Sequence, residues 1–294
     1  MFRNFTGFTV DEFDDIYEEL EEKYDDYERE RLDRKDRKRA VGGGRKFKLP
    51  LKERFLMLLV YYRLYITYSL VGFLFDMHLS NVCRDIKHLE PLVKQCIPIP
   101  ERIEAKIEKM GKLEELLEVF PEMSAFTDAI SLEIPRPKDK QKRKDYYSGK
   151  KKKHTIKTQI TNNKKGLIVH ISKSVEGKKH DYKLFKEQPP PIPKNIERIH
   201  DSGYQGIKKD FPELKVRIPY KKPKGRELTE TQKEYNKELR RERVVSEHTI
   251  GKMKKYEIMG SKFRNSPERY DTMTTIIGGF VNYKTMDSDD ITLK

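Results

Sequence analysis

The apolar residues of this sequence change their spacing near residue 123, and this change most restricts the folds that the chain can adopt. Before that point, apolar side chains recur every three or four residues, as they do on one face of a helix. After it, short alternating runs typical of strands are separated by helical segments. This order predicts an all-α part followed by an α/β part with a mixed sheet.

Three helices are predicted in the first part, over about residues 51–65, 68–75 and 80–87. The turn "DMHLS" joins the second to the third, and Ser80 is placed to cap the third. The exposed face of this third helix would carry Asn81, Arg84, Lys87 and His88. Such a face is typical of the recognition helix of a helix-turn-helix, whose first side chains meet base edges. A small helical bundle is the alternative interpretation.

Strand and helix patterns alternate in the second part. "AFTDAISLEI" is predicted to be a strand, and "HTIKTQIT" and "GLIVHIS" form a hairpin around the turn "NNKKG". "HDYKLFKE" is helical, "IERIHD" and "LKVRIPY" are further strands, and a long helix follows over about residues 229–256. The fold class expected for this part is therefore α/β with a mixed sheet.

The distribution of charge favours a polyanionic partner. The 294 residues carry a net charge of +15, but residues 1–30 hold twelve acids and three bases. The rest of the chain therefore carries a net charge of +24, which indicates binding to nucleic acid. A basic surface that is merely solvated is the other explanation.

Residues 1–48 are predicted to form an acidic amphipathic helix and a basic hinge. The apolar residues from Phe13 to Tyr27 fall on one helical stripe, and Asp11 is a candidate N-cap. Three glycines at 42–44 mark a joint. The helix either dimerises or shields the basic body, or it packs on its own domain.

Neither a membrane span nor a secreted domain is indicated. The apolar run from Phe55 to Phe75 contains Arg63 and several Tyr, so buried helices are expected. The N-terminus lacks the apolar core of a signal peptide. The two cysteines, Cys83 and Cys96, predict neither a disulfide framework nor a zinc site, and a reducing compartment is expected.

Three acidic residues stand where a two-metal site needs carboxylates. Asp128 lies inside an apolar strand, where an acid is costly unless it is paired or bound to metal. Asp201 ends the strand "IERIHD", and Glu247 lies on the long helix. Two divalent ions about 3.5–4 Å apart need oxygen ligands from such distant segments. Each residue also has a purely structural explanation: a hydrogen-bonded core acid, a turn former and an exposed helical residue.

The segment "RIHDSGYQGI" at residues 198–207 has two interpretations. It is a strand end with a turn, in which Asp201 and Ser202 bond to the local backbone and Gly203 supplies a positive φ. Alternatively, it presents Asp201 at the edge of a sheet as a metal ligand. The two other acids and the basic charge favour the second interpretation.

Four blocks occur in a fixed order along the chain. The first three are "FTDAISLEIPRPKDKQKRKDYYSGKKKKHTIKTQI", "KSVEGKKHDYKLFK" and "HDSGYQGI", and the fourth contains Arg243, Glu247 and Lys254. Together they resemble the DDE-class insertion-sequence transposases, in the group related to the PIF/Harbinger elements. The similarity covers roughly residues 45–285. One position departs from the family pattern, because Arg240 stands where the fourth block usually has Tyr.

The resemblance implies a ribonuclease-H-like catalytic domain at 119–286, preceded by an all-α helix-turn-helix domain at 49–118 and followed by a tail at 287–294. The metal ligands that it implies are Asp128, Asp201 and Glu247. It also implies Mg²⁺ or Mn²⁺ as cofactor, with two ions in the site. Cleavage at the ends of an element would be followed by attack of the freed 3′-OH on target DNA.

Further residues are expected near this site. Asp181 is the rival for the second carboxylate, with an N-cap as its structural alternative, and His180, Arg243 and Lys254 are secondary candidates. The stretch Arg136–Lys157 holds eleven Lys or Arg and suits phosphate tracking, unless it is a solvated charge run. Its candidates for DNA binding are Lys150, Lys151, Lys152, Lys153, Tyr146 and Tyr147.

The leading hypothesis is a transposase that binds the terminal inverted repeats of a mobile element and cuts double-stranded DNA with metal ions. A homo-oligomer is expected by resemblance, as is a location on the nucleoid in the cytoplasm of a prokaryote or in a eukaryotic nucleus. The alternatives are a catalytically silent DNA-binding descendant and a metal-dependent nuclease of other specificity.

Overall fold

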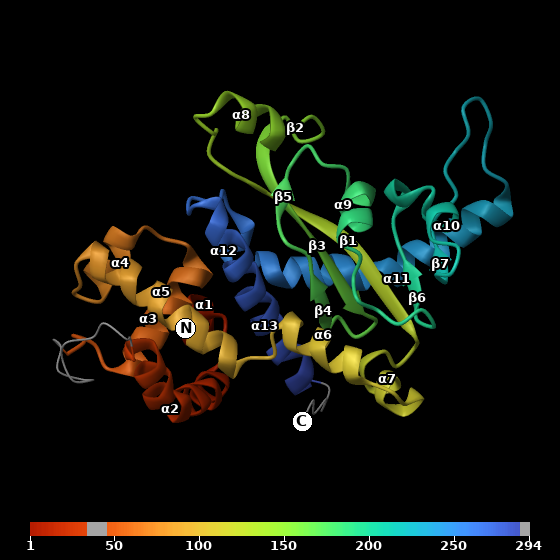
Figure 1. Ribbon diagram of the computed structural model, residues 1–294. Helices are drawn as coiled ribbons and strands as arrows, with labels where there is room; N and C mark the ends of the chain where they lie inside the picture. The colour runs from red at the N-terminus through yellow and green to blue at the C-terminus, as the bar shows by residue number, and fades with distance from the viewer. Residues whose placement is uncertain (34–45, 289–294) are drawn as a thin grey trace. The chain divides into compact units, whose positions relative to one another are not determined.

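The computed structural model describes residues 1–33 and 46–288, in two compact units (Figure 1). The helical unit comprises residues 1–97 with 255–258, and the α/β unit comprises the residues from 98 to 254 and from 259 onward. The predicted glycine hinge at 42–44 lies outside the described residues. Within the described residues, no helix is both long and apolar enough to cross a membrane.

The helical unit contains the three helices predicted between residues 51 and 87. Its helices in the described residues are α1 (Phe2–Thr6), α2 (Val10–Leu32), α3 (Leu51–Leu64), α4 (Tyr68–Leu74) and α5 (Leu79–Cys96). The α5 helix is longer than predicted, because Leu89, Leu92 and Val93 continue its buried stripe. Its N-cap is His78 and not Ser80, since His78 Nδ1 accepts a hydrogen bond from the Ser80 N–H at 3.3 Å.

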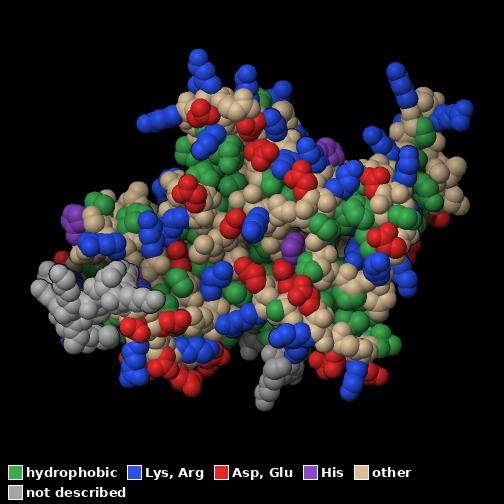
Figure 2. All heavy atoms as spheres, in the orientation of Figure 1, with side chains coloured by type: hydrophobic (Ala, Val, Ile, Leu, Met, Phe, Trp, Pro, Cys, Tyr) green, Lys and Arg blue, Asp and Glu red, His purple; other side chains and the backbone are tan. Residues whose placement is uncertain are grey.

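The acidic helix α2 packs on its own unit. Its N-cap is Thr9 and not Asp11, because Thr9 and Glu12 bond reciprocally to each other's backbone N–H groups in a capping box. The side chains of Phe13, Ile16 and Leu20 are buried. The opposite face leaves its Asp and Glu side chains in solvent (Figure 2).

The α/β unit is built on a mixed sheet. Its strands are β1 (Ser124–Glu133), β2 (Tyr147–Ser148), β3 (Lys153–Asn163), β4 (Ile168–Ile171), β5 (Val175–Glu176), β6 (Glu197–Ile199) and β7 (Val216–Arg217). The order is β2-β3-β1-β6-β7, with β4 and β5 also paired to β3. The β1 strand runs antiparallel to β3 and parallel to β6, and β7 is parallel to β6. This arrangement confirms the expected fold class and agrees with the ribonuclease-H-like fold that the resemblance implies.

Helices cover both faces of this sheet (Figure 1). The remaining helices of the described residues are α6 (Pro100–Lys109), α7 (Leu113–Val119), α8 (Lys140–Tyr146), α9 (Asp181–Glu187), α10 (Ile207–Asp210), α11 (Glu230–Lys254), α12 (Glu257–Gly260) and α13 (Tyr270–Ser288). The first two residues of α12 belong to the helical unit. On one face, Ile103 of α6 packs in a core with Ala125. On the other face, Leu239 of α11 packs on Phe126 and Ile199. Because side chains two residues apart on a strand share a face, Asp128 lies on the α11 side with Phe126.

The hairpin between β3 and β4 forms at the predicted turn. Asn163 Oδ1 accepts hydrogen bonds from the N–H groups of Lys165 and Leu167, each at 3.0 Å. Gly166 has a φ of +87°, in the left-handed region where glycine is favoured. The turn chemistry of "NNKKG" therefore determines this connection locally.

Candidate active site and DNA-binding face

Asp128 and Asp201 come from neighbouring parallel strands. Phe126 of β1 is paired with Ile199 of β6, and the two acids each follow two residues later. Continued in the same register, the strands therefore bring the two acids to one level and one face of the sheet. The negative charge of Asp201 acts on Asp128, as this proximity requires.

The loop that begins at Asp201 is a tight turn into a short 3₁₀ helix, Ser202–Tyr204. Asp201 Oδ1 accepts a hydrogen bond from the Gly203 N–H at 2.7 Å, which leaves Oδ2 for other partners. The predicted positive φ at Gly203 is wrong, because Gly206 has the positive φ, +97°. A Cβ at 203 would lie only 2.9 Å from Asp201 Oδ1, so any other residue there would displace the Asp201 carboxylate.

Glu247 and Arg243 lie on the face of α11 that borders Asp201. Arg240, Arg243 and Glu247 are spaced by three and four residues, so they form one stripe of the helix. All three line a cavity of about 560 Å³ together with Asp201. Arg243 Nη2 lies 3.8 Å from Asp128 Oδ2, which links this cavity to β1. Glu247 itself is exposed.

The negative charge of Asp128 is only partly balanced by nearby positive charge. Burial raises its pKa, and the charges of Asp201 and Asp181 raise it further. The Ala129 N–H, at 2.7 Å from Oδ1, and Arg243 act in the opposite direction. An excess of negative charge in a partly buried site favours the binding of a cation.

The acids do not form a ready ligand cluster. Across residues 1–33 and 46–288, no group of three or more His, Cys, Asp or Glu side chains is arranged to hold a metal ion. The donors themselves are carboxylate oxygens, the ligands that hard divalent cations take in proteins.

The rival acid Asp181 opens α9, with His180 as its N-cap. His180 Nδ1 accepts a hydrogen bond from the Tyr182 N–H at 3.3 Å. Asp181 Oδ1 pairs at 2.7 Å with Nζ of Lys157, whose side chain is 11% exposed. Asp181 therefore lies close enough to influence Asp128, but it has a cationic partner of its own.

The basic stretch Arg136–Lys157 is partly ordered into α8 and β2, and Lys and Arg side chains project from this region (Figure 2). The predicted DNA-binding lysines Lys150, Lys151, Lys152 and Lys153 are all exposed. Two of them have partners, since Lys151 Nζ donates to Ser131 O at 2.9 Å and Lys153 pairs with Glu133 at 2.6 Å. Burial and the charge of Lys254 lower the pKa of Lys151, so the end of α11 approaches this stretch.

The two tyrosines of this stretch differ in exposure. Tyr147 is 42% exposed, and its ring meets the His154 ring edge to face with centroids 5.6 Å apart. Tyr146 is partly buried, and burial raises its pKa. Of the two predicted stacking residues, Tyr147 is the more accessible.

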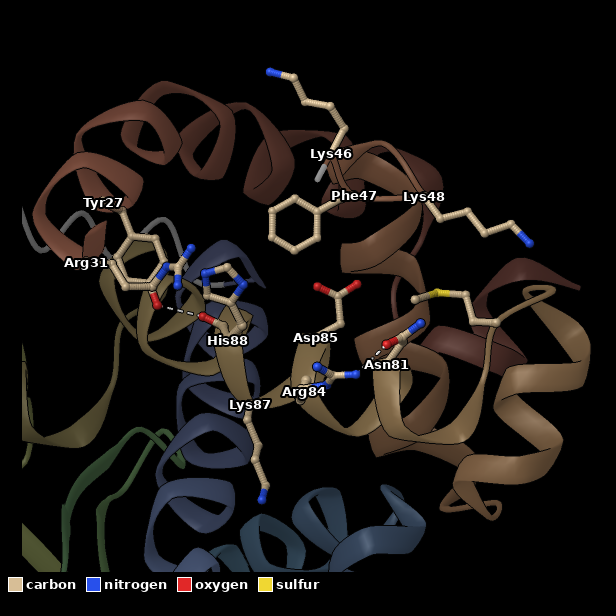
Figure 3. Close-up of a pocket in the computed structure, with 11 residues that line it drawn as sticks. Tyr27, Arg31, Lys46, Phe47, Lys48, Asn81, Arg84, Asp85, Lys87 and His88 are labelled. Atoms are coloured by element: carbon tan, nitrogen blue, oxygen red, sulfur yellow. Dashed lines mark hydrogen bonds between the residues drawn. The ribbon is translucent and has the colours of Figure 1, made fainter. Parts of the chain in front are cut away.

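In the helical unit, the exposed face of α5 borders a cavity of about 1050 Å³ (Figure 3). Asn81, Arg84 and Lys87 are exposed there, and Arg84 Nη2 donates to Asn81 Oδ1 at 2.7 Å. The prediction that His88 is exposed is wrong, because its side chain is 12% exposed and Nε2 lies 2.6 Å from Glu28 Oε1. The reason lies in the tertiary structure, because Glu28 of α2 pairs with the His88 ring and holds it against that helix.

Residues outside the predicted recognition helix line the same cavity. Arg31 comes from the end of α2, and Lys46, Phe47 and Lys48 come from the segment before α3 (Figure 3). These residues were not predicted from the sequence. The basic run "RKFK" is a weak signal for them, since nothing local shows that it returns to α5.

A buried ion pair beneath this face was also missed. Arg54 of α3 donates from Nε to Asp85 Oδ1 of α5 at 2.7 Å and from Nη1 to the Tyr24 hydroxyl at 2.8 Å. The side chains of Arg54 and Asp85 are 1% and 4% exposed. The pair and the Tyr24 hydroxyl join α2, α3 and α5. The only sequence signal for the pair is that α3 and α5 each carry a charged residue among their buried apolar positions.

A buried polar layer supports the Asp201 loop from behind. His200 is fully buried and its ring stacks on Tyr204 at 4.5 Å, while burial lowers its pKa to about 3. The Gln159 side-chain amide donates to the Tyr204 hydroxyl. The Tyr in "DSGY" is the sequence signal for this layer, but His200 and Gln159 were missed.

The chain has recognisable relatives. Residues 127–282 match the family described as DDE superfamily endonuclease, and residues 47–99 match the helix-turn-helix of DDE superfamily endonuclease. The chain is 34% identical over 241 residues to a probable transposase for insertion sequence element IS702 from Microchaete diplosiphon. The aligned region covers 82% of this chain and 83% of that protein. No solved structure matches significantly.

These matches agree with the geometry of both units. The helix-turn-helix match covers α3, α4 and α5, and it implies DNA binding by that unit. Endonucleases of this superfamily generally use divalent metal ions, and the paired acids of β1 and the Asp201 loop are suitable donors. The chain therefore belongs to the DDE superfamily endonucleases, as an enzyme of the insertion-sequence transposase class.

Proposed function

We propose that this transposase cuts DNA at the ends of its element and joins the freed 3′ ends to target DNA, with Asp128, Asp201 and Glu247 as its catalytic residues. One observation carries the proposal. The register of β1 and β6 leads Asp128 and Asp201 to one level, beside a cavity that Asp201 shares with Glu247. The third carboxylate thus approaches from a helix and the first two from strands.

The proposed cofactor is Mg²⁺ or Mn²⁺, with two ions held by these carboxylates. When bound, such ions lower the pKa of an attacking water and neutralise charge on the transition state. The donor set fits, because a cation would relieve the repulsion that Asp201 and Asp181 exert on Asp128. Binding would have to draw the three carboxylates together by side-chain rotation.

Arg243 and Lys254 are proposed to hold DNA phosphates at this site. Arg243 already limits the repulsion at Asp128, and its guanidinium has donors to spare for a phosphate oxygen. Lys254 ends α11 near Lys151, so the two ammonium groups suit neighbouring phosphates.

A DNA-binding domain at residues 49–118 is proposed to bind the terminal inverted repeats, through the part of it that belongs to the helical unit, residues 49–97. Asn81 and Arg84 would contact base edges, and Lys87 would contact a phosphate. The basic stretch with Tyr147 would follow the backbone of the DNA that enters the α/β unit. Because transposition joins two ends of one element, we expect a homo-oligomer to act.

The test is cleavage of a supercoiled plasmid that carries the ends of the element, with Mg²⁺ or Mn²⁺. The variants are Asp128→Asn, Asp201→Asn and Glu247→Gln. The matched control is Glu238→Gln, an exposed carboxylate on the same helix that does not line the cavity with Asp201. Mn²⁺ binding by calorimetry and DNA binding by anisotropy give readouts besides activity.

The proposal expects cutting to be lost in all three variants and kept in the control, with weaker Mn²⁺ binding and unchanged DNA binding. If the wild-type protein bound the ends but never cut with either metal, the proposal would be wrong, and the chain would be a catalytically silent DNA-binding descendant of a transposase. If only Asp181→Asn abolished cutting, Asp181 and not Asp201 would be the second carboxylate of the site. Equal cutting of unrelated or branched DNA would indicate a nuclease of other specificity.

A further inference from the structure

Tyr220 is an exposed aromatic residue on the wall of the cavity that contains Asp201 and Glu247. Its side chain is 51% exposed, although tyrosine usually buries much of its ring. The volume of about 560 Å³ lies within the range of about 300–1,000 Å³ that is usual for small-molecule pockets. An aromatic face thus stands beside the proposed catalytic residues without an evident role in the core.

The backbone of Tyr220 is held from two sides. The Asn236 side chain of α11 accepts from the Tyr220 N–H at 2.8 Å and donates to its carbonyl oxygen at 3.0 Å. Gln205, from the loop that follows Asp201, donates to the carbonyl oxygen of Pro219 at 3.1 Å. Both elements that carry proposed catalytic residues therefore fix the position of this tyrosine.

The ring is also supported. It meets the Tyr235 ring edge to face, with centroids 5.2 Å apart and an angle of 65° between the planes. A side chain that is already ordered loses little conformational entropy when a ligand stacks on it. This arrangement suits binding better than a freely rotating surface tyrosine would.

The charges around Tyr220 favour a nucleic-acid ligand. The cavity is lined by four cations of α11, which are Lys233, Lys237, Arg240 and Arg243. Lys233 pairs with Glu230 at 2.7 Å, and Arg243 faces Asp128. Lys237 and Arg240 have neither an ion pair nor a side-chain hydrogen bond within the described part of the chain, so they are available for phosphates.

We propose that Tyr220 is a stacking platform for a base that has left the duplex at the DNA end, with Lys237 and Arg240 on the adjoining phosphates. This inference rests on the proposed function, because it places that end at Asp128, Asp201 and Glu247. An aromatic ring stacks on a base only where a base face is free. Inside a duplex the neighbouring pairs cover both faces, so the ligand is an unpaired base.

The test compares two fluorescent duplexes of the element end found in the cleavage assay. One is fully paired, and the other has unpaired bases at the cleaved terminus. Affinities are measured by anisotropy with the full chain carrying Asp128→Asn, so that the DNA stays intact. Tyr220→Ala should bind the unpaired end about ten-fold more weakly, the usual scale for one lost aromatic–base stack, and should bind the paired end as before.

Three further variants separate stacking from a structural role. Tyr220→Phe keeps the ring and should keep the preference for the unpaired end. Asn236→Ala keeps the ring but frees its backbone, so it should lose part of the preference. Leu113→Ala removes an exposed apolar side chain of α7 outside the cavity and should change neither affinity.

The outcomes distinguish this inference from the function on which it rests. Tyr220→Ala with an unchanged preference, or a chain with no preference for the unpaired end, overturns the stacking role even if cleavage depends on the three carboxylates. An equal loss for both duplexes shows a structural defect and also overturns it. Absence of cleavage by the wild-type chain overturns the proposed function instead.

Discussion

Asp85 in the helical unit and Asp128 in the α/β unit are both acids on an otherwise apolar side of a regular element. Asp85 has Arg54 as a close partner, with Nε at 2.7 Å and Nη2 at 2.6 Å from Oδ1. Asp128 has Arg243 at 3.8 Å and feels two other acids. One charge is therefore balanced inside the protein and the other is not.

The difference follows what each region does. A surface that only binds DNA works best when its supporting charges are neutralised internally and its helix is held rigidly. A site that recruits cations gains from excess negative charge, at a cost in stability of the empty protein. The proposed DNA-binding face thus rests on a buried ion pair, whereas Asp128 of the proposed catalytic site lacks a close cationic partner.

The largest expected effect on stability comes from removing Arg54, the cationic partner of Asp85. Arg54→Met leaves Asp85 buried without a partner, which typically costs about 3–5 kcal/mol. Hydrogen exchange in peptides of α3 and α5 should show the loss, while peptides of β1 and β3 keep their protection. The double variant Arg54→Met/Asp85→Leu should recover most of the stability. A loss below about 1 kcal/mol in the single variant would contradict a structural role for the pair.

The next effect concerns the surface that this ion pair supports. Arg84→Ala should weaken binding to the correct DNA end by about 1–3 kcal/mol while barely changing binding to random DNA, because a base contact is lost. Lys87→Ala should weaken both and reduce the slope of log K against log salt by about 0.9, as for one phosphate contact. Titrations at several salt concentrations measure both quantities, and equal changes in the two variants would refute the assignment.

Substitution of Asp128 is expected to increase stability, the opposite of the effect of Arg54→Met. Asp128→Asn removes a partly buried charge and its repulsion with Asp201, so the α/β unit should gain stability at neutral pH, on the order of 1 kcal/mol. Urea unfolding without divalent ions measures this gain. Glu238→Gln, on α11, is the control and should leave the stability unchanged. A less stable Asn variant would show that Asp128 is balanced after all.

The smallest effect is the response of the helical unit to acid. Burial lowers the pKa of His88, although Glu28 opposes the shift. The unfolded chain therefore takes up a proton near pH 6.5 that the folded unit resists, so this contribution to stability is present above pH 6.5 and falls as the pH decreases. His88→Gln should reduce the slope of stability against pH below 6.5 by well under about 1.4 kcal/mol per pH unit, the value for one full proton. An unchanged slope in hydrogen exchange at α5 would contradict it.

Much of the secondary structure follows from the sequence, because its causes are local. The apolar spacing predicts α3 and α11 to within two residues at each end, and "NNKKG" predicts the hairpin with Gly166 at its turn. Caps were less predictable. Thr9 and Asp11 are both good capping residues, and only the reciprocal bonds with Glu12 select Thr9.

Glycine roles show the same limit. A Gly after Asp-Ser predicts a positive φ, yet Gly206 has the positive φ, and a side chain at 203 would instead displace the Asp201 carboxylate. The choice depends on how the Asp201 side chain bonds to the turn, and several arrangements of the same residues are locally acceptable.

By itself, the sequence determined the fold class, three candidate acids for one site, and the order of most longer helices and strands between residues 51 and 256. Helices α6 and α13 were not predicted. Only the tertiary structure decided the surroundings of the charged residues: the register that sets Asp128 beside Asp201, the pairing of Lys157 with Asp181, and the inward turn of His88. The reason is physical. Periodicity and turn chemistry act over a few residues, whereas the partner of a buried charge depends on which distant segment the packing of the sheet and helices brings within reach.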